Sequence, residues 1–402
     1  MRLPGAGRER VIYRGGVIET PVSESVWDHA ARPEPVAGQT PEAYTVERYA
    51  VADSGDDVPN GEGTERRAHT DAQGRRRNLT FPALPEPLPH PVVDNHTHLD
   101  MQDGLVRVSV VDAMATARDA SVCGVVQAGC DVESSRFAVA AAQTVPRVLA
   151  AVALHPNEAP TLAGSGVSGD LDAPAPAGDG SAKGSGAGRF ESDGPGGVSA
   201  AGRFTGARDA GSTGGRSLDE ALAVIDELAG QRRVRCVGET GMDRVHTPES
   251  GLAVQEESFR AHIEIAKRHG VAMQIHDREA HEDVVRILRD AGAPERTVFH
   301  CFSGDAELAR LCNENGWYMS FAGTVTFKNA APLKAALREA DPGLVLCETD
   351  APFLTPHPFR GRPNAPYMVN YTVRGMAEIL DTDLEELCRR IWENSERVYG
   401  QF

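Results

Sequence analysis

The feature that most constrains the fold is a regular alternation of apolar runs and helical patterns that begins near residue 91. Strands that alternate with helices indicate parallel βαβ units, and eight such units indicate a closed barrel. An open doubly wound sheet is the alternative, but no glycine-rich dinucleotide loop follows the first run. We therefore predict an α/β fold, a (β/α)8 TIM barrel. Its eight strands are expected at residues 92–96, 124–128, 148–154, 235–239, 271–276, 297–302, 317–322 and 344–350.

The segment before the barrel has a different composition. Residues 1–88 mix Gly, Pro, Asp, Arg and Glu with little apolar periodicity and end in the proline-rich FPALPEPLPHP. Such a segment is typical of a low-complexity, mostly disordered N-terminal arm. One apolar patch within it, RVIYRGGVIE, is a candidate for a hairpin or for docking on the barrel. The barrel domain itself is predicted to span residues 89–402.

A second segment interrupts the barrel after the third strand. Residues 157–216 consist largely of Gly, Ala, Ser and Asp. This composition cannot bury enough apolar surface to offset the entropy lost on ordering, so we expect a flexible Gly/Ser-rich insertion. Ser217 then begins the next helix, with Glu220 three residues later completing a capping box.

Charge and cysteine content exclude several classes of protein. The formal net charge of -17 at pH 7 argues against broad adhesion to nucleic acid, which needs a basic surface. No apolar run approaches the roughly eighteen residues that span a bilayer, and the N-terminus lacks an apolar core of signal-peptide length. The seven cysteines form no CxxC pair, so we expect reduced thiols in a cytoplasmic protein.

Residues that can bind metal fall at the ends of the predicted strands. The first strand ends in His96 and His98, which are two residues apart and therefore project to the same face. The carboxyl ends of all eight strands form one rim in a (β/α)8 barrel, and that rim is where its enzymes place their sites. Four further residues of this kind close later strands: Glu239, His276, His300 and Asp350.

Each of these residues also has an ordinary interpretation. A single histidine at a strand end is commonly a hydrogen-bonded core residue, and a single rim carboxylate can pair with an arginine. Six such residues at the ends of five strands are better explained by cations, because a buried cluster without them would be strongly desolvated.

Six nitrogen and oxygen donors suit two divalent ions better than one, because one ion would keep no open position for water or substrate. We expect Glu239 to bridge the ions, with His96, His98 and Asp350 on the first and His276 and His300 on the second. The ions would be Mg²⁺, Mn²⁺ or Zn²⁺. Asp350 can also accept a proton from the attacking water, so Glu239 and Asp350 are the predicted catalytic residues.

The same motifs, taken in order, resemble a known family. DNHTHLD, ALHPNEAP, VGETGMD, QIHDREA, FHCFSG and ETDAPFLTP followed by Arg360-Gly361 are similar to the landmarks of the TatD family of metal-dependent deoxyribonucleases, TIM barrels of the amidohydrolase-like superfamily. The resemblance spans residues 91–400. It implies a divalent-metal-dependent phosphodiesterase, a deoxyribonuclease and often a 3′ to 5′ exonuclease, with DNA ends as substrate and the same six residues as metal ligands.

The resemblance also assigns residues around the metal ligands. It implies that His155 lies beside the substrate and that Arg278 and Arg360 face phosphates. The chain departs from the family pattern at Gly241-Met242-Asp243-Arg244, which has no aromatic residue after the aspartate, and at Pro363-Asn364-Ala365-Pro366, which lacks one cation and one carboxylate.

Other functions stay open at this point. Dinuclear barrels serve many chemistries, so the chain could hydrolyse another small phosphoester, an ester or an amide. A non-enzymatic scaffold that keeps the metal only for stability is a further alternative. We expect a monomer that does not bind membranes.

Overall fold

The structure is a computed structural model that describes residues 10–13, 16–19, 65–66, 76–104, 108–163 and 216–402. The disorder expected for the rest of residues 1–75 and for most of the insertion therefore lies outside the described residues. Within the arm, β1 (Arg10–Tyr13) and β2 (Gly16–Glu19) pair as the antiparallel hairpin that the sequence indicated. A two-residue strand, β3 (Glu65–Arg66), pairs with β5 (Gln102–Asp103).

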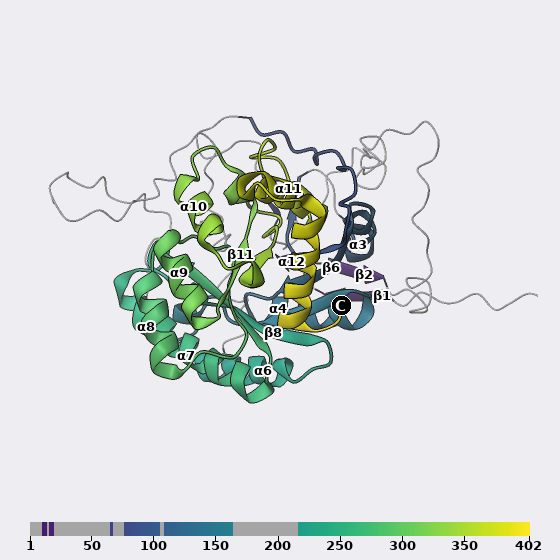
Figure 1. Ribbon diagram of the computed structural model, residues 1–402. Helices are drawn as coiled ribbons and strands as arrows, with labels where there is room; N and C mark the ends of the chain where they lie inside the picture. Colours follow the sequence, from purple (N-terminus) through teal and green to yellow (C-terminus); the bar gives the residue numbers. More distant parts are fainter. Residues whose placement is uncertain (1–9, 14–15, 20–64, 67–75, 105–107, 164–215) are drawn as a thin grey trace, which may run out of the picture.

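Eight parallel strands form a nearly closed barrel, which confirms the predicted fold class (Figure 1). Neighbouring strands are consecutive among the eight, as expected when each strand–helix unit packs beside the previous one. The bounds lie within a few residues of those predicted from the apolar runs. The strands are β4 (Val92–Thr97), β6 (Val122–Ala128), β7 (Val148–Val152), β8 (Val234–Asp243), β9 (Ala272–Arg278), β10 (Thr297–Phe299), β11 (Tyr318–Phe321) and β12 (Val345–Cys347).

Polar contacts join the first strand to the segment that follows the last one. Thr97 forms a parallel bridge with Ala351. The buried carboxylate of Asp94 accepts hydrogen bonds from the backbone N–H of Thr349 at 2.8 Å and from its hydroxyl at 2.6 Å. These contacts hold the ends of β4 and β12 together, so the residues that follow both strands meet at one rim.

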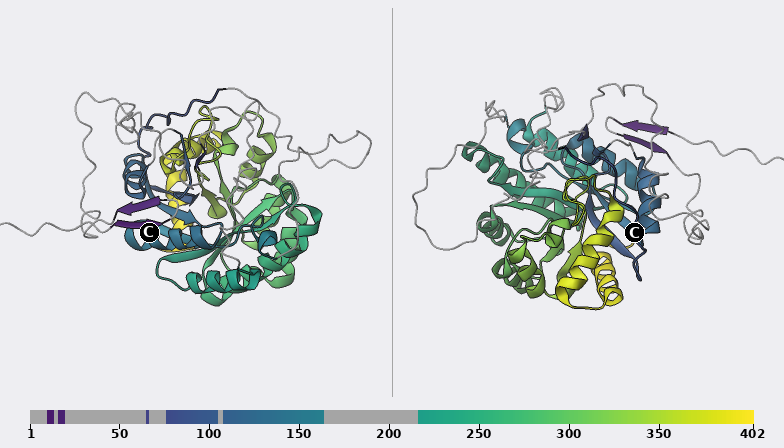
Figure 2. Two further views of the ribbon diagram at one scale, coloured as in Figure 1. Left: turned by 180° about the vertical axis from the view of Figure 1, so that it is seen from behind. Right: turned by 90° about the horizontal axis from the view of Figure 1, so that it is seen from above.

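Helices surround the barrel on its outer side (Figure 2). Ser217 and Glu220 form the predicted capping box at the start of α6. The α-helices are α3 (Val110–Asp119), α4 (Val132–Thr144), α5 (Ala159–Leu162), α6 (Leu218–Ala229), α7 (Leu252–His269), α8 (His281–Ala291), α9 (Ala306–Asn315), α10 (Ala331–Glu339), α11 (Val369–Leu380) and α12 (Leu384–Tyr399). Short 3-10 turns occur at η2 (Glu249–Gly251), η3 (Gly323–Thr326), η4 (Pro342–Leu344) and η5 (Pro366–Met368).

The interior of the barrel is filled by side chains that alternate along the strands. Val126 and Ala128 of β6 and Leu149 and Ala151 of β7 belong to one buried cluster, which also contains Tyr399 at the end of α12. The Tyr399 hydroxyl accepts a hydrogen bond from the side-chain amide of Gln274 at 2.8 Å. The barrel is therefore a packed core, and its chemistry is confined to the rim.

The last part of the predicted arm, residues 76–88, packs against the barrel, so the expected disorder does not extend to it. Leu79 and Leu88 are buried. Local composition indicated disorder because the segment is rich in proline, but its partners lie some 280 residues away in the sequence. Side chains of α11 and the turn before it donate to three backbone carbonyls of this segment: Tyr367 to Pro82 at 2.6 Å, Tyr371 to Ala83 at 3.1 Å and Asn370 to Glu86 at 2.9 Å.

A buried ion pair fixes the start of this docked segment. Arg77 Nη2 lies 2.5 Å from Asp103 Oδ2, and the two side chains are only 4% and 0% exposed. Arg77 Nε also donates to the carbonyl of Gly361 at 3.0 Å. One guanidinium thus links the arm, the segment after β4 and the segment after β12.

Replacing Arg77 by alanine is expected to lower the free energy of unfolding by about 3–5 kcal/mol, because it leaves the Asp103 carboxylate buried and unpaired. Chemical denaturation of the variant and the parent measures the difference. Arg76→Ala is the matched control, since Arg76 is exposed. Equal stability of the two variants would show that the ion pair contributes nothing.

The first residues of the predicted insertion pack against the barrel. Residues 157–163 belong to the described fold, and α5 starts within them with Ala159 fully buried. The Asn157 side chain donates to Asp243 Oδ2 at 3.2 Å and accepts from the Thr247 hydroxyl at 2.9 Å. Composition alone predicted that Asn157 belongs to a flexible segment. Its side chain instead has buried hydrogen-bond partners, which hold residues 157–163 against the barrel.

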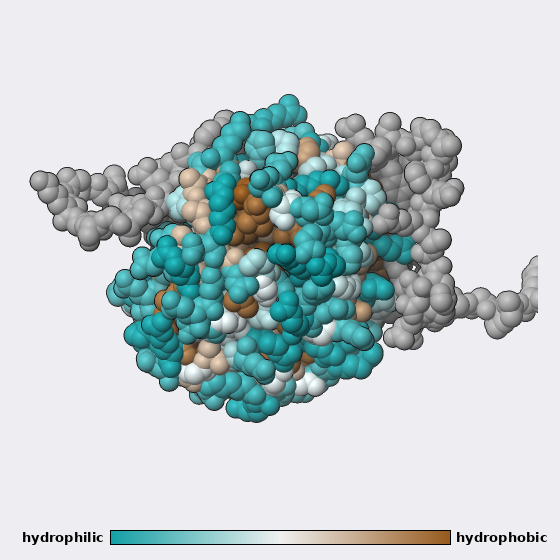
Figure 3. Space-filling model, viewed as in Figure 1, coloured by the Kyte–Doolittle hydropathy of each residue, from teal (hydrophilic) through white to brown (hydrophobic). Residues whose placement is uncertain are grey.

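The outer surface is mostly hydrophilic on the face seen in Figure 3. Among the described residues, Val245 is the one large apolar side chain that is mainly exposed, at 51%. Over the same residues, every helix is too short or too polar to cross a membrane.

Candidate metal centre

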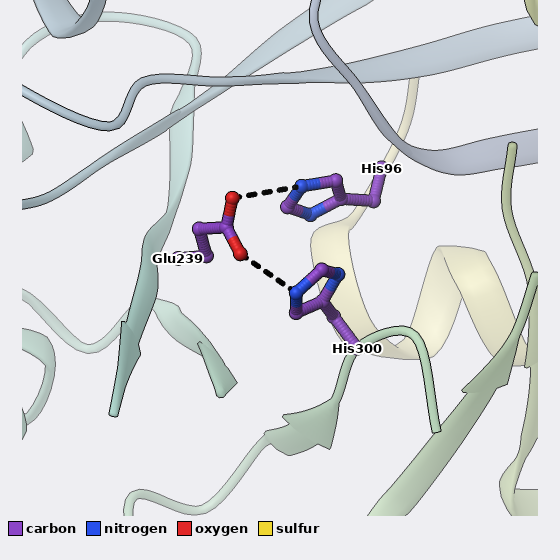
Figure 4. Close-up of side chains that lie close together, drawn as sticks. All are labelled: His96, Glu239 and His300. Carbon is purple, nitrogen blue, oxygen red and sulfur yellow. Dashed lines mark ion pairs between the residues drawn. The ribbon is translucent and has the colours of Figure 1, made fainter. Parts of the chain in front are cut away.

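Glu239 lies at the centre of a buried group of imidazoles at the rim. It sits within β8 and is 2% exposed. Its two carboxylate oxygens point to different histidines (Figure 4): Oε1 lies 3.7 Å from His96 Nε2, and Oε2 lies 2.7 Å from His300 Nε2. The carboxylate is therefore placed to contribute to two donor groups at once.

The first donor group consists of His96, His98, Glu239 and Asp350. The two Nε2 atoms lie 3.2 Å apart. They lie 3.7 and 3.5 Å from Glu239 Oε1, and 3.7 and 3.3 Å from Asp350 Oδ1. Four nitrogen and oxygen ligands placed tetrahedrally at bond lengths near 2.1 Å would lie about 3.4 Å apart. The residues present thus fit a divalent cation.

Hydrogen bonds orient the two histidines of this group. His96 Nδ1 lies 2.8 Å from Gln274 Oε1, and His98 Nδ1 lies 3.2 Å from the carbonyl of Ala128. Both partners are acceptors, so each Nδ1 atom carries a hydrogen and each Nε2 atom faces the other donors. The Gln274 amide nitrogen donates to the Asn95 carbonyl at 2.6 Å, which assigns the Gln274 oxygen to His96.

The second donor group surrounds Glu239 Oε2. His300 Nε2 lies at 2.7 Å and His276 Nδ1 at 3.1 Å from this oxygen. Each imidazole has a carboxylate behind it: Glu348 Oε1 lies 3.3 Å from His300 Nδ1, and Asp243 Oδ2 lies 3.3 Å from His276 Nε2. Carboxylates in this position orient metal-bound histidines and increase their basicity. The structure therefore brings all six predicted ligands together.

His155 also reaches this group, although the sequence placed it only beside the substrate. Its Nε2 lies 3.7 Å from Glu239 Oε2 and 3.3 Å from His276 Nδ1. Burial and the neighbouring His276 lower the pKa of His155 to about 3, so the ring is neutral. Because Nδ1 accepts the N–H of Asn157 at 3.1 Å, the hydrogen resides on Nε2. His155 is thus a hydrogen-bond donor aimed at the centre and has no free nitrogen lone pair for an ion.

Protons balance the charge of the centre in the metal-free protein. Burial opposes the charged form of His98, but the hydrogen bond to Asp350 and the charge of Glu239 raise its pKa to about 9. Burial likewise opposes charge on His276, and Asp243 and Glu239 raise its pKa to about 9. Burial alone would raise the pKa of Glu239, yet the charge of His300 and the hydrogen bonds from His276 and His300 hold it well below its usual value. The centre therefore contains anions that stabilise positive charge.

Metal affinity is expected to rise with pH up to about 9, because His98 and His276 hold protons below that pH and a cation must displace them. The affinity should increase about tenfold per pH unit for each proton displaced. Titrations of the metal-free protein with Zn²⁺ at pH 6, 7 and 8 measure the slope. A pH-independent affinity would show that the imidazoles are already unprotonated.

Sequence reasoning missed Asp243, which closes the second group. It lies four residues beyond Glu239, and we expected the strand to end at Glu239, whereas β8 continues to Asp243. Burial opposes ionisation of Asp243, but hydrogen bonds from His246 and His276 hold its pKa far below the usual value. The spacing of four between Glu239 and Asp243 could have indicated this role, because residues an even number apart in a strand project to the same face.

The two predicted phosphate-binding arginines lie in different settings. Arg278 ends β9, and its buried Nε has no hydrogen-bond partner among the described residues. The guanidinium of Arg360 lies over the ring of Phe327 at 4.0 Å. No contact within the described part of the chain joins Arg360 to the donor groups, so its predicted role stays a prediction.

Fold and donor groups together define a metal-dependent hydrolase built on a (β/α)8 barrel. A family model described as "TatD related DNase" matches residues 93–400. The chain belongs to this family, as its motifs had indicated.

Two similar relatives carry general names. The chain is 36% identical over 313 residues to the "uncharacterized metal-dependent hydrolase TatD" of Mycobacterium tuberculosis, an alignment that covers 77% of this chain and 98% of the relative. It is 43% identical over 182 residues to the "uncharacterized metal-dependent hydrolase YabD" of Bacillus subtilis, covering 45% of this chain and 71% of the relative.

Solved structures of the same family share the fold. A TatD homologue from Escherichia coli, YJJV, matches with a TM-score of 0.57 at 19% identity and covers 77% of this chain and 98% of that one. A TatD family hydrolase from Entamoeba histolytica matches with a TM-score of 0.55 at 14% identity, covering 78% and 100%.

Proposed function

We propose that the protein is a divalent-metal-dependent phosphodiesterase that hydrolyses DNA from its ends as a deoxyribonuclease. The observation that carries this proposal is the position of Glu239, whose two oxygens each face a separate donor group. Such an arrangement suits two divalent ions bridged by one carboxylate, the kind of centre that serves phosphate ester hydrolysis. Membership of a family described as "TatD related DNase" supports the choice of DNA.

When bound, the ions would lower the pKa of water and neutralise charge that develops on the phosphate. The remaining roles belong to side chains. Glu239 contacts both donor groups and so fixes their relative position. Gln274 accepts a hydrogen bond from His96 Nδ1 and orients its ring. Asp350 contributes Oδ1 to the first group, and the described residues give its Oδ2 no hydrogen bond. That second oxygen is placed to accept the proton of the attacking water.

An anionic substrate is supported by the residues around the second group. The buried Nε of Arg278 lacks a protein partner among the described residues, and an unpaired buried donor is costly unless a ligand satisfies it. A phosphate oxygen is such a ligand, because guanidinium and phosphate form charge-assisted hydrogen bonds. A local cation of this kind is needed, since the whole chain carries a net charge of -17.

Replacing His155 by alanine is expected to reduce kcat about a hundredfold, because one preorganised hydrogen-bond donor to the reacting phosphate is lost. Metal content should stay unchanged, since the hydrogen on Nε2 leaves no lone pair for an ion. Elemental analysis beside steady-state kinetics measures both quantities. Loss of one metal equivalent would instead identify His155 as a ligand.

The proposal is tested with end-labelled single-stranded and double-stranded DNA after loading with Mg²⁺, Mn²⁺ or Zn²⁺. We expect mononucleotides to be released progressively from the 3′ end. RNA, cyclic nucleotides, small phosphoesters, carboxylic esters and amides form the comparison panel. Preferential hydrolysis of any of these over DNA would overturn the proposed substrate and leave the metal centre in place.

A further inference from the structure

The buried face of α7 carries polar side chains that have no role in the proposed mechanism. Gln255, Ser258 and His262 lie on this face and are 0%, 1% and 0% exposed. Successive members are three or four residues apart, so they form one stripe along the helix. The inner face of a helix that covers a core is normally apolar, and a buried polar group is costly unless it is hydrogen-bonded. The partners of the stripe are therefore informative.

Both ends of this stripe bind residues next to His155. His262 Nε2 accepts the backbone N–H of Leu154 at 3.0 Å. The side-chain amide of Gln255 donates to the side-chain oxygen of Asn157 at 3.5 Å. Asn157 in turn donates its backbone N–H to His155 Nδ1 at 3.1 Å. The helix thus holds the turn both before and after His155.

The hydrogen bond to His262 replaces strand pairing that this turn lacks. β7 ends at Val152, so residues 153–155 lie beyond the strand. Their backbone N–H groups bind three separate acceptors: Ala153 the Ser135 hydroxyl at 3.2 Å, Leu154 the His262 ring at 3.0 Å and His155 the Cys130 carbonyl at 2.7 Å. Since a buried N–H without an acceptor is costly, the position of each acceptor helps to fix the course of the turn.

The ring of His262 is held in the state that accepts. Its Nδ1 donates to the carbonyl of Ser258 at 2.7 Å, so Nε2 presents a lone pair to Leu154. Burial lowers the pKa of His262 to about 4, which keeps the ring neutral near pH 7. Both ring nitrogens are thus engaged with backbone groups, and the side chain acts on the turn alone.

We infer that His262 is a positioning residue that holds the turn of His155 so that the His155 ring reaches the second donor group. His155 Nε2 lies 3.7 Å from Glu239 Oε2 and 3.3 Å from His276 Nδ1, separations that a shift of the turn would change directly. A displacement of about 1 Å can reduce a rate about a hundredfold. The inference rests on the role of His155 in the proposed function but not on which phosphate ester is hydrolysed.

Two replacements of His262 test the acceptor. His262→Leu removes it, and kcat of the metal-loaded protein should fall about ten- to a hundredfold while KM and metal content stay unchanged. His262→Gln places an oxygen as many bonds from Cβ as Nε2 is, so it should restore most of the lost rate. Should His262→Leu fail to fold, His262→Phe, which keeps a ring without an acceptor, takes its place.

A double-mutant cycle distinguishes positioning from general stabilisation. If His262 acts through His155, His262→Leu should have little further effect on kcat in a protein that already carries His155→Ala. A general loss of structure would instead reduce the rate by the same factor in both backgrounds. Additive effects therefore overturn the inference.

Amide hydrogen exchange provides a measurement that needs no substrate. The Leu154 amide should exchange much faster in His262→Leu than in the parent and should stay protected in His262→Gln. Unchanged exchange in His262→Leu overturns the inference by itself. His269→Leu is the matched control, because His269 also lies on α7 but its Nε2 contacts Asp226 Oδ1 at 2.8 Å. It should change neither the exchange of Leu154 nor kcat.

The outcomes separate this inference from the proposed function. If the parent cleaves another ester of the comparison panel in place of DNA, the proposed substrate is wrong, and the cycle is measured with that ester. If His155→Ala leaves kcat unchanged, the role of His155 is overturned and the inference with it. Circular dichroism establishes that each variant is folded before it is assayed.

Discussion

Replacing Glu239 by glutamine is expected to abolish hydrolysis, with kcat falling at least about a thousandfold, because both donor groups lose their shared anion. Glutamine keeps the size of the side chain but removes the negative charge that faces His96 on one side and His300 on the other. Metal content should fall from two equivalents to one or none. Kinetics on DNA and elemental analysis of the dialysed protein measure both effects.

The matched control for this variant is Glu348→Gln. Glu348 is also a fully buried carboxylate at the rim, but it contacts His300 from behind, at 3.3 Å from Nδ1. Loss of such a partner typically reduces metal affinity 10- to 100-fold, roughly, without removing the site. Two metals should therefore bind at saturating concentration. If Glu239→Gln, loaded with metal, degraded DNA at the parent's rate, the proposed mechanism would be wrong.

The sequence allowed the barrel and the six donors to be predicted because both depend on local pattern. The apolar run before His96 marks a strand buried on both faces, and a spacing of two places His96 and His98 on one side of it. Parallel strands then bring their carboxyl ends to one rim, so His276 and His300 were expected near Glu239 without any coordinates. In the structure His276 Nδ1 and His300 Nε2 lie 3.1 and 2.7 Å from Glu239 Oε2.

Other features depend on contacts that local pattern does not contain. The docked segment 76–88 is rich in proline and was expected to be disordered, but hydrogen bonds from α11 and from the turn before it hold the segment. Cys130 was predicted only to be a reduced thiol, because the sequence does not show that the turn after β6 places its sulfur 3.6 Å from Glu239 Oε1. The ladder between β8 and β9 is irregular between Val237 and Thr240, which obscured the continuation of β8 to Asp243.

Asp350→Asn is expected to remove the ion at the first position and to leave the second in place. Asp350 Oδ1 lies 3.7 Å from His96 Nε2 and 3.3 Å from His98 Nε2. Among the described residues, the carboxylate makes no such contact with His276 or His300. Metal content should therefore fall from two equivalents to one. Activity should fall at least about a thousandfold, because one donor group and the acceptor of the water proton are lost together.

Asparagine is a suitable replacement at this position because of the backbone. Asp350 has a φ of 52°, in the left-handed region where Asn and Asp are the most tolerated side chains after glycine. The variant therefore changes charge without straining the chain. Asp381→Asn is the matched control, since Asp381 has a φ of 51° at the end of α11, and it should keep both metals and full activity. An Asp350→Asn protein that retained two metals and the parent's rate would show that the first donor group does not require this carboxylate. That result would contradict the proposal that the protein hydrolyses DNA with two divalent ions that share Glu239 as a ligand.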